Sequence, residues 1–185
     1  MALSRTAAVT LISLSRIPLA LAFVATLAPR PGNVLFCVAF TVAALITDVA
    51  DGFFARRLGI ATVRGRHWDS LGDKSFYMAV DVAFISNGVL LSTLGWALIA
   101  REIALYTTRI LYLENLDRVE AIRPYTNWHG YFMYLLIVLG LAEMWGVSSG
   151  RSYGLFPYIQ LAALGAIAFG VASVFAYIRL GPQVR

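Results

Sequence analysis

Apolar runs of roughly 20 residues follow one another along most of this chain, and this length is what a helix needs to cross the ~30 Å hydrocarbon core of a bilayer. The pattern predicts spans at about residues 7–28, 33–55, 67–87, 90–112, 126–147 and 155–178. Of all residues, 59% are hydrophobic and only 14% are charged, whereas a soluble domain carries about 25% charged residues. We therefore predict an all-α integral membrane protein in which residues 1–185 form a single domain, a bundle of six transmembrane helices.

The positions of the basic residues predict the orientation of this bundle. If both termini are cytoplasmic, the three outer connections hold only Arg30 and Arg151, and the other basic residues fall on the inner side. Arg16 interrupts the first apolar run, and no small-residue cleavage site follows it, so we expect a retained helix rather than a signal peptide. The expected location is the plasma or inner membrane, among anionic lipids. Nucleic acid is not an expected partner, because the basic residues lie at a membrane face without a soluble domain.

Four aspartates stand near the inner ends of the second and third predicted spans. Asp48 and Asp51 are spaced i, i+3 and share one helix face, while Asp69 and Asp73 are spaced i, i+4 on the next helix. The connection between the two spans is short, so the helices are expected to be antiparallel neighbours whose acidic ends meet. Ionisable residues at the hydrocarbon edge are functional candidates by default, because they cost a few kcal/mol each unless paired or hydrated.

Converging carboxylates in a partly dehydrated cleft cannot all stay ionised without cations. Their hard oxygen ligands favour Mg²⁺, Mn²⁺ or Ca²⁺, and two ions of the Mg²⁺ type beside a basic loop are typical of phosphoryl chemistry. Arg56 is placed to bind a diphosphate, and Gly52, Ala55 and Gly65 lack bulk, so a flat ligand can approach closely. The simpler alternative is a solvated ring of ion pairs with the neighbouring arginines and Lys74. We rank it below a metal site.

Residues 48–73 resemble the signature of the CDP-alcohol phosphatidyltransferase family. The resemblance covers all eight fixed positions of that signature: Asp48, Asp51, Gly52, Ala55, Arg56, Gly65, Asp69 and Asp73. It implies a six-helix fold, usually homodimeric, with the active site at the cytoplasmic end of the second and third helices. The implied reaction transfers a phosphatidyl-type group from CDP-diacylglycerol or a similar CDP-lipid to a polar alcohol acceptor and releases CMP.

The same resemblance implies roles for individual residues. Asp48, Asp51 and Asp69 would be metal ligands, and Asp73 would be both metal-associated and the general base that deprotonates the acceptor hydroxyl. The remaining fixed positions would bind the CDP-lipid: Gly52, Ala55 and Gly65 at the cytidine and Arg56 at the diphosphate.

A second segment gives information on which alcohol is the acceptor. Arg101-Glu102-Ile103 followed by Arg109 resembles the phosphatidylglycerophosphate synthase branch of the family, where it would belong to a pocket for the acceptor's phosphate. That branch tends to continue with Lys-x-Lys-Thr, but this chain has Arg123-Pro124-Tyr125-Thr126. We predict that Arg101, Arg109 and Arg123 bind the acceptor, with glycerol 3-phosphate as the first choice. Inositol phosphate, serine and phosphatidylglycerol are alternatives. Pairing of Arg101 or Arg109 with Glu102 or Glu114 is the structural alternative.

Other features leave questions open. Intramembrane acids also mark ion pathways, so a cation transporter or channel is the alternative from another class, although it would place its acids nearer the membrane midplane. The inner connection is predicted at about 113–125, and it ends at Pro124, a residue that can break a helix before the fifth span. The sequence assigns no role to Asp81 or Glu143. His67 and His129 are expected to be only interfacial or hydrogen-bonding residues.

Overall fold

The computed structural model describes residues 10–26, 31–57, 63–111 and 116–180. Within these helices the side chains of a few segments lie outside the description, among them 51, 52, 54–56, 63–69, 109–111 and 116–121. The described residues form helices and turns, with no strand among them. They belong to two compact units, Met1–Ala83 and Phe84–Arg185.

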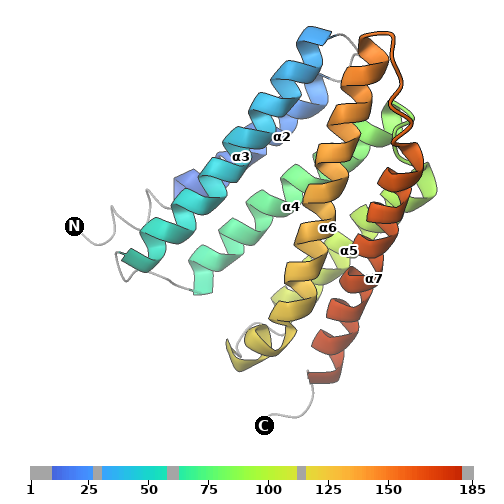
Figure 1. Cartoon of the computed structure of the whole chain (residues 1–185). Coiled ribbons are helices and arrows are strands. Elements are labelled where there is room, and N and C mark those ends of the chain that lie inside the picture. Colours follow the sequence, from blue (N-terminus) through green and yellow to red (C-terminus); the bar gives the residue numbers. More distant parts are fainter. Residues whose placement is uncertain (1–9, 27–30, 58–62, 112–115, 181–185) are drawn as a thin grey trace. The chain divides into compact units, whose positions relative to one another are not determined.

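The first unit contains α2 (Arg16–Ala25), α3 (Pro31–Arg57) and most of α4 (Val63–Ser86). Figure 1 shows α2 lying along α3. The ring of Phe23 meets the ring of Phe76 edge-on, at 5.6 Å between centroids, and so joins α2 to α4. Small and aromatic side chains fill this interior, since it also includes Ala20, Val34, Cys37, Ala44, Ala79 and Val80.

Gly72 marks a close approach between α4 and the residues just before α2. A Cβ atom added at Gly72 would lie 2.4 Å from the backbone oxygen of Ser13 and 3.6 Å from Cβ of Arg16. Only a residue without a side chain allows this distance, as small residues do where membrane helices touch. The approach places Arg16, the first residue of α2, directly against α4.

The second unit contains α5 (Ser92–Leu111), α6 (Leu116–Ser148) and α7 (Phe156–Leu180). The two longest of these, α6 and α7, run side by side, and α5 also packs on α7 (Figure 1). Gln160 of α7 ties down the turn before α5, because its Nε2 donates to the oxygen of Val89 (2.9 Å) and its Oε1 accepts from the nitrogen of Leu91 (3.0 Å). The interior is mostly aliphatic, and includes Leu98, Leu105, Ile122, Met133, Leu136, Ile137 and Ile159.

Glu143 organises the connection between α6 and α7. Its Oε1 accepts a hydrogen bond from the hydroxyl of Ser152 (2.6 Å), and its Oε2 accepts one from the backbone nitrogen of Leu155 (3.1 Å). A buried carboxylate is thereby satisfied, and the loop is held over the helix end. This is the role that the sequence left open.

The prediction of a helix break before the fifth span is wrong. Helix α6 begins at Leu116 and continues through Pro124, so most of the expected inner connection at about 113–125 is helical. A proline inside a helix removes one backbone hydrogen bond and crowds the preceding turn, which either kinks or ends the helix. Here helical turns flank Pro124 on both sides.

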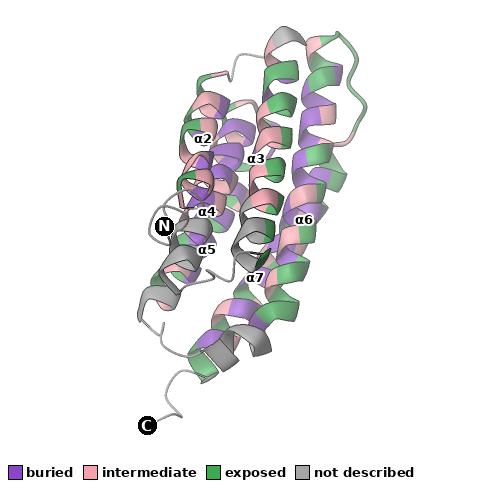
Figure 2. Ribbon diagram, turned by 90° about the vertical axis from the view of Figure 1, so that its left-hand side faces the viewer, coloured by how far each residue is buried: buried purple, intermediate pink, exposed green. Residues whose placement is uncertain are grey.

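Within the described residues, three helices are long and apolar enough to cross a membrane: Asn33–Ala50, Ile122–Ser148 and Phe156–Arg179. Helix α3 is mostly exposed or intermediate in Figure 2, and its exposed side chains include Leu35, Phe36, Ile46 and Val49. Such a surface suits lipid better than water. Helices α4 and α5 carry charged residues within their apolar stretches, including Asp73, Lys74, Asp81, Arg101 and Glu102. The chain is therefore a membrane protein, and the full set of six spans remains a prediction.

We expect Gly72→Ala to destabilise the protein by about 1–3 kcal/mol, because the new methyl group would overlap backbone rather than a movable side chain. Gly130→Ala is the matched control. Gly130 also lies inside a helix, but an added Cβ would meet nothing within 4 Å, so this change should be neutral or slightly stabilising. Thermal unfolding midpoints in detergent measure both. Equal midpoints for the two variants would show that α4 can move away from Ser13.

Candidate functional site

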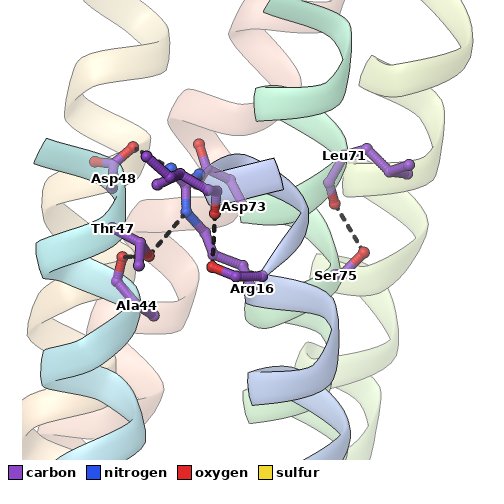
Figure 3. A network of polar contacts seen from close by, with 9 residues as sticks. Arg16, Ala44, Thr47, Asp48, Leu71, Asp73 and Ser75 are labelled. Atoms are coloured by element: carbon purple, nitrogen blue, oxygen red, sulfur yellow. Dashed lines mark hydrogen bonds and ion pairs between the residues drawn. The ribbon is translucent and has the colours of Figure 1, made fainter. Parts of the chain in front are cut away.

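Arg16 brings two of the predicted metal ligands together. Its Nη2 lies 3.4 Å from Oδ1 of Asp48 on α3, and its Nη1 donates to Oδ1 of Asp73 on α4. Its Nε donates to the hydroxyl of Thr47 (3.4 Å), which in turn donates to the oxygen of Ala44 (2.8 Å). Figure 3 shows the guanidinium of α2 reaching between the two other helices. Asp48 and Asp73 lie on different helices, and both contact the guanidinium of Arg16.

Exposure differs sharply across this cluster. The Arg16 side chain is 1% exposed, whereas those of Asp48 and Asp73 are 38% and 34% exposed. The positive group is therefore enclosed by the helices, while both acids also face outward. Part of each carboxylate is therefore accessible to a ligand.

The donor chemistry of this cluster fits a divalent cation. Carboxylate oxygens are the ligands that Mg²⁺ and Mn²⁺ prefer, and each carboxylate has about four lone-pair sites, so a bond to Arg16 leaves capacity for a metal. Asp48 and Asp73 are a minimal pair for such a site. Among the residues whose side chains are described, no group of three or more candidate ligands occurs.

The remaining members of the signature lie where only the backbone is described. Asp51, Gly52, Ala55 and Arg56 are on the last turns of α3, and Gly65 and Asp69 are on the first turns of α4. Their side chains, and that of His67, lie outside the described residues. Their assignment as metal ligands or CDP-lipid contacts thus stays a prediction.

A second polar cluster lies in the interior of the other unit. Arg101 on α5 pairs through Nη1 with Oε1 of the adjacent Glu102, and its Nη2 donates to the hydroxyl of Ser173 on α7 (3.1 Å). His129 on α6 places Nε2 2.8 Å from the same Glu102 oxygen, and its Nδ1 lies 2.8 Å from the oxygen of Ala166. All four side chains are buried. The cluster connects three helices without facing outward.

Helix α7 has a glycine, Gly170, where the side chain of Arg101 packs against it. A Cβ atom at Gly170 would lie 2.5 Å from Nε of Arg101, so a larger residue there would displace the guanidinium. The structure therefore shows, for Arg101, the pairing with Glu102 that the sequence held as an alternative. Arg123 is exposed on α6, and the side chain of Arg109 lies outside the described residues. Of the predicted acceptor residues whose side chains are described, Arg101 is thus buried and Arg123 exposed.

The sequence did not identify two residues of these clusters, Arg16 and His129. Neither Arg16, which interrupts the first apolar run, nor His129 was assigned a specific partner from the sequence. An arginine inside an apolar run must find an anion, and this need was the available signal. Which acid it would find was not readable, because Arg16 and Asp73 are 57 residues apart.

Comparison with characterised proteins adds independent findings. One relative, from Aquifex aeolicus, is 30% identical over 139 residues, which cover 72% of this chain and 72% of that protein. Another, from Bacillus subtilis, is 25% identical over 146 residues, or 79% and 70% of the two chains. A third, from Mycoplasma genitalium, is 26% identical over 151 residues, or 74% of this chain, which spans only 62% of that longer protein. All three are named CDP-diacylglycerol–glycerol-3-phosphate 3-phosphatidyltransferase.

Residues 7–177 match the CDP-alcohol phosphatidyltransferase family as a whole, a region that includes both acid-bearing helices and the buried cluster of the second unit. Since the match covers nearly the entire chain, this protein belongs to the CDP-alcohol phosphatidyltransferase family.

Proposed function

We propose that this protein transfers a phosphatidyl group from CDP-diacylglycerol or a similar CDP-lipid to glycerol 3-phosphate and releases CMP. The observation that carries the proposal is the convergence of Asp48 and Asp73, from the two halves of the family signature, on the guanidinium of Arg16. The names of the relatives support the choice of acceptor. Phospholipid synthesis is the corresponding process.

Asp48, Asp51, Asp69 and Asp73 are proposed to hold Mg²⁺ or Mn²⁺, as two ions. Bound there, the cations would neutralise the charge that develops on the phosphate under attack and on the departing CMP. The partial exposure of Asp48 and Asp73 supports this role, because their carboxylates can be reached from outside the helices. Gly52, Ala55 and Gly65 are proposed to line the cytidine pocket, and Arg56 to bind the diphosphate.

Asp73 is proposed to be the general base. A carboxylate within reach of the acceptor hydroxyl takes its proton as the oxygen attacks phosphorus, while the bond from phosphorus to the CMP oxygen breaks. The contact of Asp73 with Arg16 keeps this carboxylate on α4 oriented toward α3. Attack and departure then occur between the same two helices.

Arg101, Arg109 and Arg123 are proposed to favour a phosphorylated acceptor, because arginine offers a planar fork that matches phosphate. Their environments differ. Arg123 is exposed and can meet a soluble ligand, whereas Arg101 is buried against Glu102 and Ser173, so its replacement would also disturb the packing of α5 and α7.

The arrangement in the membrane belongs to the same proposal. We propose six spans in a homodimer, with both termini and the acidic helix ends on the cytoplasmic side of a plasma or inner membrane. The scarcity of basic residues in the predicted outer connections supports this orientation.

Purified protein in detergent is expected to convert CDP-diacylglycerol and glycerol 3-phosphate into phosphatidylglycerophosphate and CMP only when Mg²⁺ or Mn²⁺ is present. The reason is that converging carboxylates require cations before an anionic diphosphate can approach. Mass spectrometry of the lipid product and chromatography of the nucleotide measure both products. Inositol phosphate, serine and phosphatidylglycerol serve as competing acceptors. Full turnover in excess chelator, or release of CDP, would contradict the proposal.

Asp73→Asn is expected to lower kcat by at least about 100-fold, because an amide cannot accept the acceptor's proton and a positioned general base contributes roughly 10²–10⁴-fold. The matched control is Asp81→Asn, the same isosteric change two turns further along α4, at a buried aspartate outside the signature. The control should keep its turnover. Steady-state kinetics at saturating Mg²⁺ compare the two, and equal kcat values would remove the assignment of Asp73 as the base.

Replacing Arg109 or Arg123 with alanine is expected to raise the KM for glycerol 3-phosphate, since a charge-assisted contact to phosphate contributes about 1.5–3 kcal/mol. The KM for CDP-diacylglycerol should change less, and thermal midpoints should stay close to wild type. Arg101→Ala should lower the thermal midpoint as well, because it leaves the carboxylate of Glu102 buried beside His129. Arg151→Ala, at an exposed position on the outer connection, is the control. An unchanged acceptor KM in all three variants would favour an uncharged or lipid acceptor.

A further inference from the structure

Arg16 is a buried charge with an unusual set of partners. Its guanidinium contacts Thr47 and Asp48 on α3 and Asp73 on α4, while its own backbone belongs to α2. One side chain therefore joins α2, α3 and α4 beside two of the proposed metal ligands (Figure 3). The proposed reaction described so far uses only its contact with Asp73.

The backbone around Arg16 is held as closely as its side chain. Gly72, the residue before Asp73, packs against the backbone oxygen of Ser13, and Ser13 is itself buried. Arg16 follows one helical turn later, so it cannot shift along α4 without moving this contact. The guanidinium is thus held at a defined place relative to Asp73.

The shape of the guanidinium matters as much as its charge. A planar fork can donate along several fixed directions at once, whereas a lysine ammonium acts as a point charge on a flexible stem. Here separate nitrogens contact Thr47, Asp48 and Asp73. This contact set fixes how far apart the two carboxylates stand and how they are turned.

We propose that Arg16 is a positioning residue of the active site: it holds Asp48 and Asp73 at the separation that lets both bind a divalent cation and lets Asp73 reach the acceptor. The inference rests on the metal site of the proposed function. Two simpler roles make different predictions. If Arg16 only supplied positive charge, it would compete with the metal. If it only anchored α2, its loss would change stability without changing metal affinity.

The test measures Mn²⁺ binding to the whole purified protein in detergent, by electron paramagnetic resonance of free Mn²⁺, without substrates. The variants are Arg16→Lys, which keeps the charge but loses the fork, and Arg16→Met, which loses both. We expect each to bind Mn²⁺ about tenfold or more weakly, the usual loss when a residue that orients metal ligands is removed. At saturating Mn²⁺, kcat should remain reduced in both, because Asp73 is still misplaced.

Arg101→Met is the matched control, since it also removes a buried arginine that pairs with a carboxylate, but from the other unit. Its Mn²⁺ affinity should equal that of the wild type even if its thermal midpoint falls. Asp48→Asn removes a proposed metal ligand, and its loss of Mn²⁺ affinity is the reference for the losses in the Arg16 variants.

Wild-type affinity in Arg16→Lys, or tighter binding in Arg16→Met, would overturn the positioning role. So would unchanged affinity in folded variants that have only a lower thermal midpoint. If neither Arg16 variant folds, Thr47→Val decides, because it removes the contact to Nε and leaves the arginine. A loss of roughly two- to tenfold, the range of one hydrogen bond, supports the proposal, and no loss overturns it. Absence of Mn²⁺ binding in the wild type would instead refute the metal site itself.

Discussion

The contact of one buried guanidinium with two carboxylates is the interaction on which the first unit depends. Charges in a low-dielectric interior are costly unless they are paired and hydrogen-bonded, so each charge on these helices constrains where its neighbours can lie. Arg16 brings together α2, α3 and α4 through Asp48, Asp73 and Thr47. The apolar contacts around it, such as Phe23 against Phe76, are less directional and could tolerate small shifts that the ion pairs cannot.

The polar clusters around Arg16 and Arg101 differ in the exposure of their acidic side chains. Around Arg16 the cation is enclosed and the acids are about one-third exposed, which suits a site that must admit a ligand. Around Arg101 the acid, the arginine, His129 and Ser173 are all buried, which suits a joint between helices. Both clusters pair arginine with carboxylate, but in this structure only the cluster around Arg16 has partly exposed acids.

Hydropathy and the family signature predicted much of this protein. Apolar runs located α3, α4, α5 and α7 to within a few residues, because a membrane helix must be long and apolar whatever its neighbours are. The prediction failed at Pro124, where helix α6 continues from Leu116. The low helix propensity of proline does not reveal that the turns on both sides of Pro124 are helical, so that the helix continues although one backbone hydrogen bond is missing. The partners of Glu143, Ser152 and Leu155, could not be predicted either, because they lie in a connection without hydrophobic periodicity.

The sequence by itself determined the class of protein and the residues of the signature, because both depend on residue types at short, regular spacings. Only the tertiary structure decided which charges meet. Arg16 contacts an acid 57 residues away, and Arg101 contacts Ser173 72 residues away, while helix spacing says nothing about either pairing. The close approach at Gly72 likewise depends on a backbone oxygen from another part of the chain. Such contacts arise when helices pack, and packing is a property of the whole fold rather than of any segment.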